Sequence, residues 1–340
     1  MKILVFEYIT GGGFNKQELP DSLASEGRLM LQALLDNLCG ISGMELVVML
    51  DSRVNDLLST SGINTVIIYP EHNCHEEFAR LAQDCDAVWP VAPEFENILQ
   101  TLCQTVEQSG KILLTSPARA VTITGNKFHT YQLLKQHNIA TVPTRKFKYR
   151  CGFIRTTRIN SRLHHGEWMI KPVDGAGCAN SYLISDSKDL ALMNIRKGQY
   201  VIQPHIQGKK TSFSCLFRRG SAWLLCVNLQ QFNIINRQYH LTEIIVNYDS
   251  NLKVYQNLVD NIAQVLPELW GYVGIDLIET PEQLLVLEIN PRLTTSFAGI
   301  YAALGINVAE NVLQLLEGKP KLKPVCDRQI TIKMGHNDTD

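Results

Sequence analysis

The chain lacks a disulfide framework, a long apolar run and an excess of charge of either sign. Its 340 residues include nine cysteines, an odd number, and no Cys-x-x-Cys pair occurs, which argues against both a disulfide scaffold and a structural zinc site. No run of about 18 apolar residues is present, so the sequence predicts no membrane-spanning helix. Lys and Arg number 32 against 33 Asp and Glu, so the net charge favours neither nucleic acid nor an anionic membrane as a partner.

The first residues also lack the pattern of a secretory signal. Acidic and aromatic residues interrupt the segment from Met1 to Ile9 before any long apolar run, which predicts a first strand instead. We therefore expect a cytoplasmic protein, and a homodimer is one open state of assembly. The 45% content of hydrophobic residues is ample for two or three compact units.

Strand-like and helix-like segments alternate in the first third of the chain, which predicts an open α/β domain with a mostly parallel sheet over residues 1–117. The predicted strands are Ile3 to Phe6, Leu46 to Leu50, Thr65 to Tyr69, Ala87 to Val91 and Ile112 to Thr115, and the predicted helices are Ser25 to Leu38 and Pro93 to Ser109.

An acidic hairpin is the most informative segment of the sequence. With a turn centred on Glu282, Asp276 lies opposite Glu288, and Asn290 follows on the same face because side chains alternate along a strand. Opposed side chains on paired strands lie about 5 Å apart, a spacing that suits a hard cation held by oxygen ligands. The flanking residues Ile275, Leu277, Leu287 and Ile289 are expected to form the apolar opposite face. The alternative is a surface hairpin with solvated acids.

A predicted strand that ends at Lys171 opens into a loop with Gly175, Ala176 and Gly177. Small residues let backbone N–H groups approach anionic oxygens, and the lysine adds a point charge. Upstream, Lys127 opens a predicted helix, where a second ammonium would favour an anion. Taken singly, the loop is more often a plain turn, and Lys127 more often an exposed lysine.

The extended run from Tyr200 to Gly208 reads as a connecting strand that offers backbone groups to a flat ring. Pro204 fixes the chain there without donating a hydrogen bond. A histidine next to an apolar run, such as His205, is more often packed than catalytic.

In this order, the lysine before a helix, the lysine with its glycine loop, the connecting strand and the final Glu-Ile-Asn-Pro-Arg resemble the ATP-grasp superfamily. The resemblance implies an α/β and α+β protein with an N-terminal pre-ATP-grasp domain, a small central lid domain over residues 118–200, a C-terminal lobe over 201–330 and a tail over 331–340. It also implies an ATP-dependent ligase in which a carboxylate becomes an acyl phosphate that an amine then captures.

By motif match, the resemblance assigns roles to individual residues. Lys127 and Lys171 would hold the α and β phosphates, and Gly175 to Gly177 would cover them. Asp276, Glu288 and Asn290 would bind Mg²⁺, with Mn²⁺ as an alternative. Arg292 would act with Lys171 in catalysis by forking onto the acyl phosphate, unless it forms a structural ion pair. Adenine would meet Gln203 and the backbone of Pro204, His205 and Ile206. Many members carry an acid after this strand for the ribose, whereas this chain has Lys209, Lys210 and Thr211.

Further segments resemble the tyramine–L-glutamate ligase group, which serves the synthesis of the one-carbon carrier methanofuran. They are Phe6 to Gly13, Ala24 to Arg28, Trp89 to Glu94 and Glu288 to Ser296. This resemblance implies small-molecule substrates, L-glutamate with its γ-carboxylate and tyramine. Candidates for their ammonium and carboxylate groups are Glu7, Glu26, Arg28 and Ser296, with the amides of Gly11, Gly12 and Gly13. The triple glycine is equally explained as a flexible connection, and Glu26 as an exposed acid of a first helical turn. Another amino acid or peptide pair, or a non-catalytic nucleotide-binding regulator, remains open.

Overall fold

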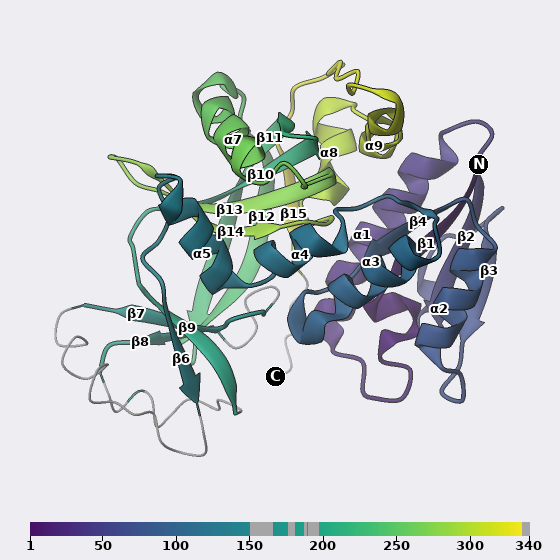
Figure 1. Cartoon of the computed structure of the whole chain (residues 1–340), viewed down its shortest axis with the longest axis horizontal. Coiled ribbons are helices and arrows are strands. Elements are labelled where there is room, and N and C mark those ends of the chain that lie inside the picture. The colour runs from purple at the N-terminus through teal and green to yellow at the C-terminus, as the bar shows by residue number, and fades with distance from the viewer. Residues whose placement is uncertain (150–165, 176–180, 187–188, 190–196, 335–340) are drawn as a thin grey trace.

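The computed structural model describes residues 1–149, 166–175, 181–186, 189 and 197–334. The N-terminal domain is an open sheet of five strands in the order β3-β2-β1-β4-β5, and every pairing between neighbours is parallel (Figure 1). The strands are β1 (Lys2–Glu7), β2 (Glu45–Asp51), β3 (Asn64–Ile68), β4 (Ala87–Val91) and β5 (Ile112–Leu113). The predicted α/β architecture of this part is therefore confirmed.

Both faces of this sheet are covered because both sets of alternating side chains are apolar. Along β1, Ile3 and Val5 pack into one core, whereas Leu4 and Phe6 pack into another on the opposite face. The first core also takes Leu31 and its neighbours from a long helix, and the second takes residues from two shorter helices. These helices are α1 (Asp21–Cys39), α2 (Cys74–Gln83) and α3 (Ile98–Gln108).

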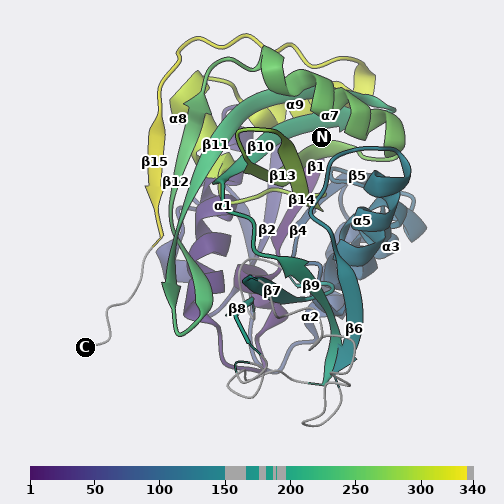
Figure 2. The same ribbon diagram turned by 90° about the vertical axis from the view of Figure 1, so that its left-hand side faces the viewer.

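The rest of the chain is built on a second sheet of ten strands with the order β14-β13-β10-β11-β12-β8-β7-β9-β6, and β15 pairs with β12. β8 and β12 are joined by a single residue pair, Gln238 with Tyr182, so β6 to β9 form a separate group in Figure 2. The strands are β6 (Arg145–Tyr149), β7 (Trp168–Pro172), β8 (Tyr182–Ile184), β9 (Gly198–Pro204), β10 (Lys209–Arg218), β11 (Ser221–Ile235), β12 (Gln238–Asp249), β13 (Gly271–Glu279), β14 (Leu284–Asn290) and β15 (Ile330–Lys333).

One face of β10 is apolar and the other carries the polar groups that matter for the site. Phe213, Cys215 and Phe217 pack against helices on one face. Because strand side chains alternate, Lys210 and Ser212 lie on the opposite face. The helices of this half are α4 (Ala118–Thr124), α5 (Lys127–Gln136), α7 (Lys253–Val265), α8 (Phe297–Leu304) and α9 (Val308–Glu317).

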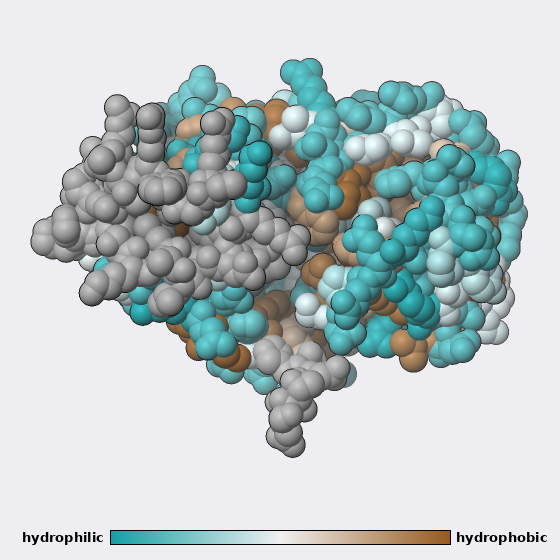
Figure 3. All heavy atoms as spheres, turned by 90° about the horizontal axis from the view of Figure 1, so that it is seen from below, coloured by the Kyte–Doolittle hydropathy of each residue, from teal (hydrophilic) through white to brown (hydrophobic). Residues whose placement is uncertain are grey.

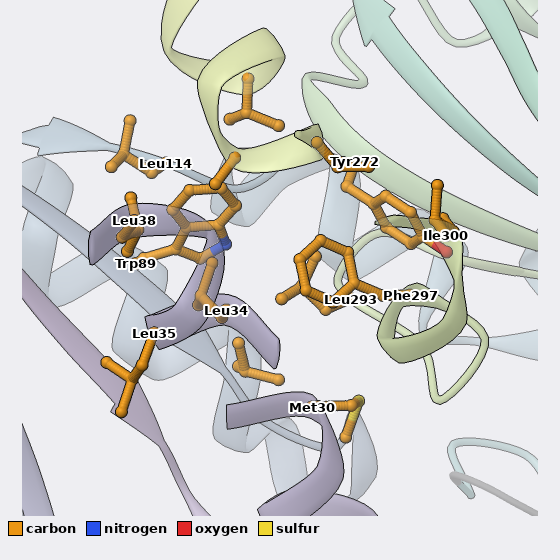
Figure 4. Packing of buried hydrophobic residues seen from close by; sticks show 14 of the residues in the cluster. Met30, Leu34, Leu35, Leu38, Trp89, Leu114, Tyr272, Leu293, Phe297 and Ile300 are labelled. Atoms are coloured by element: carbon orange, nitrogen blue, oxygen red, sulfur yellow. The ribbon is translucent and has the colours of Figure 1, made fainter. Parts of the chain in front are cut away.

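The N-terminal domain and the C-terminal lobe share one core. α1 packs against α8 and α9, and Figure 4 shows Trp89 and Leu34 of the first sheet and its helix close to Leu293 and Phe297 of the second half. These side chains are all nearly or fully buried. The parallel sheet is thus fixed against the lobe that carries the acidic hairpin.

Two predicted boundaries are wrong. The division at residue 200 cuts β9, which pairs with β6 and β7 and so belongs to the central lobe up to Pro204. The tail predicted for 331–340 begins inside β15, whose Ile330–Lys333 pair with β12. The division after residue 117 coincides with the start of α4.

In the part of the chain that the structure describes, no single helix is long and apolar enough to cross a membrane. The bent pair of α8 and α9 passes such a test jointly, on length and composition alone.

Candidate active site

A cavity of about 350 Å³ lies where the central lobe, the C-terminal sheet and α1 meet. Its size is within the range of small-molecule sites. Figure 3 shows hydrophobic residues gathered in the hollow between the two halves of the molecule. The lining includes Ser22, Ser25, Glu26 and Met30 from α1, Lys171 from β7, Gln203 to Ile206 from β9 and the segment after it, Lys210 and Ser212 from β10, Gln230 and Gln238 to Leu241 from the β11–β12 hairpin, and Asp276, Glu288, Asn290 and Arg292.

The acidic hairpin has the predicted register at its centre. Asp276 lies opposite Glu288, and Asn290 opposite Gly274. A bulge follows, because Leu277 pairs with Val286 and leaves Leu287 without a cross-strand partner. The prediction that Leu287 faces the apolar side is therefore wrong. The bulge turns it into the cavity beside Glu288.

The two carboxylates of the hairpin are held in different electrostatic states. Asn290 Nδ2 donates to Asp276 Oδ2 at 2.9 Å, and Gln230 Nε2 donates to Asp276 Oδ1 at 3.1 Å. Burial, together with the charge of Glu288, raises the pKa of Asp276 to about 6. Burial also acts to raise the pKa of Glu288, but Lys127 and Lys171 outweigh it and lower that pKa. The two carboxylates thus repel each other in a poorly solvated place, and Lys127 and Lys171 compensate mainly Glu288.

This donor set fits a hard divalent cation. A cation between the opposed carboxylates would relieve their repulsion, and carboxylate and amide oxygens are the ligands that Mg²⁺ accepts. Among the residues described, no cluster of three or more His, Cys, Asp or Glu side chains could hold a metal ion, so the amide of Asn290 is needed as the third ligand. Its oxygen would be the ligand atom, because its Nδ2 donates to Asp276.

The two predicted phosphate lysines differ in their surroundings. Lys127 begins α5, which Asn126 caps by accepting from the N–H groups of Phe128 and His129. Its buried ammonium lies 2.9 Å from Glu288 Oε2 and donates to the carbonyl of Gly175. Lys171 lines the cavity, and its ammonium has no hydrogen bond or ion pair with any residue that the structure describes.

The structure describes the glycine loop as far as Gly175. Gly175 offers its carbonyl to Lys127 and does not line the cavity. Ala176 and Gly177 lie outside the described residues, so the covering role predicted for them stays a prediction.

The end of β9 and the segment after it line the cavity, and two of their polar side chains already have partners. Gln203 Nε2 donates to Thr144 Oγ1 at 2.8 Å. The ring of His205 lies between Glu167, at 2.8 Å from Nδ1, and the hydroxyl of Tyr239. His205 is therefore packed between two partners, as the alternative interpretation of the sequence expects.

Lys210 occupies the wall of the cavity near Lys171, at the place where the sequence departs from the family pattern. Its ammonium donates to the carbonyl of Ile206 at 2.8 Å. Burial, with the charge of Lys171, lowers the pKa of Lys210 to about 8. The sequence showed the missing acid, but it did not show that the lysine points inward.

Arg292 forms a buried two-pronged ion pair with Glu94 of the N-terminal domain, with Nε to Oε1 at 2.8 Å and Nη2 to Oε2 at 2.9 Å. Its Nη1 donates to the carbonyl of Leu293 at 3.0 Å. The structural ion pair weighed as an alternative is thus present, although Arg292 also lines the cavity. Glu94 is a site residue that sequence reasoning missed. The segment Trp89 to Glu94 had been noted, but nothing linked it to a residue 198 positions away.

The substrate candidates of the N-terminal domain divide into two groups. Glu26 and Ser296 line the cavity, whereas Glu7, Arg28 and the three glycines do not. Glu7 is buried and accepts from the N–H and hydroxyl of Thr10, both at 2.7 Å, and burial raises its pKa.

The glycines have a packing explanation that neither earlier interpretation contained. A Cβ on Gly11 would lie 2.6 Å from the ring of Phe6, one on Gly12 would lie 2.5 Å from Ile68, and one on Gly13 would lie 2.4 Å from Tyr8. Gly12 also has a φ of 98°, which favours glycine. The segment Ile9–Gly13 is a tight helical turn pressed against the domain's own side chains.

Comparison with known proteins agrees with this geometry. The model of the ATP-grasp domain matches residues 124–296, just over half of the chain, and that of the pre-ATP-grasp domain matches residues 44–121. The chain therefore belongs to the ATP-grasp family. Within the family it is a ligase of the carboxylate–amine type. Enzymes of this kind use ATP and a divalent metal.

Three similar proteins illustrate the relationship. A tyramine–L-glutamate ligase of Methanocaldococcus jannaschii is 24% identical over 302 residues, which cover 88% of this chain and 84% of the relative. The crystal structure of an ATP-grasp superfamily protein from Archaeoglobus fulgidus has a TM-score of 0.71 and 23% identity over 98% of this chain and 92% of that chain. An L-amino acid ligase from Bacillus licheniformis has a TM-score of 0.62 and 16% identity over 97% and 79%.

Proposed function

We propose that the protein joins the γ-carboxylate of L-glutamate to tyramine and converts ATP to ADP and phosphate through an acyl-phosphate intermediate. The observation that carries the proposal is the single cavity that runs from the segment after β9, past the acidic hairpin, to α1 of the N-terminal domain. The part of the cavity assigned to the nucleotide and the part lined by α1 thus both adjoin the carboxylate pair Asp276 and Glu288. The name of the relative from Methanocaldococcus jannaschii supports the choice of substrates.

The nucleotide end supplies cations and backbone groups. We assign Lys171 to the phosphates because its ammonium faces the cavity without a partner in the described residues. Lys127 would join it by exchanging its contact with Gly175 for a phosphate oxygen, while Glu288 keeps it in place. Adenine would lie against Gln203 to Ile206. The N–H of Ile206 is the donor we assign to its ring, because no acceptor among the described residues takes that N–H.

Asp276, Glu288 and Asn290 are the residues that would hold Mg²⁺, or Mn²⁺ in its place. The bound ion would neutralise phosphate oxygens as charge develops on them. The chain's own contribution is to fix these three side chains through the register of the hairpin and the donors Gln230 and Lys127.

Arg292 is proposed to stabilise the acyl phosphate with the N–H groups that Glu94 and Leu293 leave free. The fork of a guanidinium suits a phosphoryl group. Glu94 fixes its plane from the opposite side, so the arginine is oriented before substrate arrives and loses little side-chain entropy on binding.

The test is ADP release by the purified protein with Mg²⁺-ATP and L-glutamate, with and without tyramine, with the product mass read from the same tube. We expect tyramine-dependent ADP and a glutamyl-tyramine mass. The matched control is Glu288→Gln, which keeps the shape of the side chain and removes its charge. ADP that appears with a different acid or amine, and not with this pair, would keep the ligase and reject the substrates.

A further inference from the structure

The cavity has a second end, beyond the acidic hairpin, whose chemistry differs from that of the nucleotide end. Here the lining comes from α1 and from β12 of the other sheet. None of the lining residues on these two elements is a lysine or an arginine. The nearby Arg292 already has Glu94 and the carbonyl of Leu293 as partners. The lining that α1 and β12 supply therefore offers no positive charge to an anion, and the free N–H groups of Arg292 are assigned above to the acyl phosphate.

Glu26 is the acid that faces this compartment. Thr295 Oγ1 donates to its Oε2 at 3.0 Å, and no hydrogen bond from the described residues reaches its other oxygen. Glu26 has no ion pair within 4.0 Å among those residues, and Arg292 is the charged group whose field reaches it. Burial raises the pKa of Glu26, and Thr295 and Arg292 oppose that shift. A carboxylate in this place has one oxygen without a hydrogen-bond donor and is poorly solvated. A cationic ligand would supply both a donor and a compensating positive charge.

Apolar side chains lie beside Glu26 and come from both halves of the molecule. Met30 follows Glu26 by four positions on α1, so the two lie on one side of the helix. Leu241 and Ile244 of β12 belong to the same hydrophobic cluster as Met30, and all three line the cavity. The compartment thus joins one acid to an apolar wall, which is the complement of a primary amine with an apolar body.

We propose that this end of the cavity is the amine subsite, in which Glu26 binds the ammonium of an arylalkylamine while Met30, Leu241 and Ile244 pack against its hydrocarbon part. The inference rests on the proposed function and deepens it, because it separates the amine from the carboxylate substrate. It also gives α1, an element of the N-terminal domain, control over which amine is used.

The proposed step balances as follows. One proton passes from the ammonium to the Glu26 carboxylate, which leaves a neutral amine with a lone pair. The nitrogen forms a C–N bond with the acyl carbon, the bond between that carbon and the phosphate oxygen breaks, and its electron pair leaves on phosphate. The second proton of the nitrogen goes to the departing phosphate. Because Glu26 contacts the nucleophile itself, it is a catalytic residue of the second half-reaction only.

This restriction gives a sharp experiment, because hydroxylamine is a largely neutral nucleophile near pH 7 and needs no proton acceptor. We would compare wild type, Glu26→Gln and, as a matched control on the same helix, Asp21→Asn, an exposed first-turn acid outside the cavity. With glutamate and Mg²⁺-ATP, Glu26→Gln should form glutamyl hydroxamate within about twofold of wild type and lose at least about 100-fold in tyramine amide formation. Asp21→Asn should match wild type in both.

A second variant tests the apolar part of the subsite, and a binding measurement tests the role of Glu26 without turnover. Leu241→Ala should raise the KM for tyramine about tenfold and leave that for ethylamine unchanged, since a lost hydrophobic contact in a pocket weakens binding by about tenfold or more. Calorimetric titration of tyramine into the protein with a non-hydrolysable ATP analogue should show binding to wild type that weakens at least about tenfold in Glu26→Gln.

The outcomes distinguish failure of the amine subsite from failure of the proposed carboxylate substrate. Equal loss of hydroxamate and amide in Glu26→Gln, or no loss of either, overturns the role of Glu26. Absence of calorimetric tyramine binding to wild type overturns the subsite. Wild type that binds tyramine but forms neither product from glutamate supports the subsite and rejects the proposed carboxylate substrate.

Discussion

The ion pair between Glu94 and Arg292 joins the N-terminal domain to the end of the acidic hairpin, and its removal should destabilise the whole molecule. Their side chains are 5% and 11% exposed, and Glu94→Gln would leave a buried guanidinium without its partner. Breaking a buried pair in this way costs about 3–5 kcal/mol. We expect about 3 kcal/mol, because Glu26 and Glu288 also lie close enough to interact with Arg292 and would retain part of the attraction.

For a chain of 340 residues, the entropy of unfolding is roughly 0.7 kcal/mol per degree, so about 3 kcal/mol lowers the midpoint of thermal unfolding by about 4 °C. The assay is calorimetry of wild type and Glu94→Gln, with Glu268→Gln as the control. Glu268 pairs with Arg119, which is 81% exposed, and an exposed pair contributes about 0–1 kcal/mol. A shift in Glu94→Gln no larger than that of the control would refute the reasoning.

Three further predictions concern charge and space around the site. Lys171→Ala and Glu288→Gln should each lower ADP formation at least about 100-fold with an unchanged circular dichroism spectrum, and near-normal turnover would remove both from the site. Because the pKa of Lys210 is lowered to about 8, its protonated form opposes folding below that pH, and the penalty fades as pH rises toward its unfolded value. Lys210→Met should therefore lose its advantage in urea over wild type progressively between about pH 8 and about pH 10.5; a constant difference would count against the lowered pKa. Gly27→Ala should cost about 1–3 kcal/mol in urea unfolding, because its Cβ would lie 2.5 Å from Glu7 Oε2, and a stabilised variant would show that this contact relaxes freely.

Local patterns predicted the parts of the fold that local physics decides. The alternation of apolar strands and amphipathic helices identified the parallel sheet, since each element must bury its own face. The spacing of Asp276 and Glu288 around a turn gave their register, and the start of a helix at Lys127 follows from the capping residue before it.

Features that depend on contacts between distant segments were not predicted. The pairing of Glu94 with Arg292 requires knowledge of how two sheets dock. The bulge at Leu287 depends on the neighbours of the hairpin, since Val142 and Ala140 hydrogen-bond to the backbone of Val286. β15 is a short strand whose residues alternate between exposed and half-buried, so its pattern carries little signal without the adjacent β12.

The core shared by the N-terminal domain and the C-terminal lobe affects how this enzyme can be recombined with relatives. Trp89, Leu34 and Met30 complete a core with Phe297 and Leu293, so exchanging residues 1–117 alone would cut through packed side chains and expose both surfaces. The strand group β6 to β9 has one ladder pair to β12 and is the more separable module, whereas α4 and α5 pack into the core of the C-terminal lobe. A chimera that alters amine choice should therefore transfer α1 together with α8 and α9, whereas one that alters nucleotide binding can exchange the strand group β6 to β9 by itself.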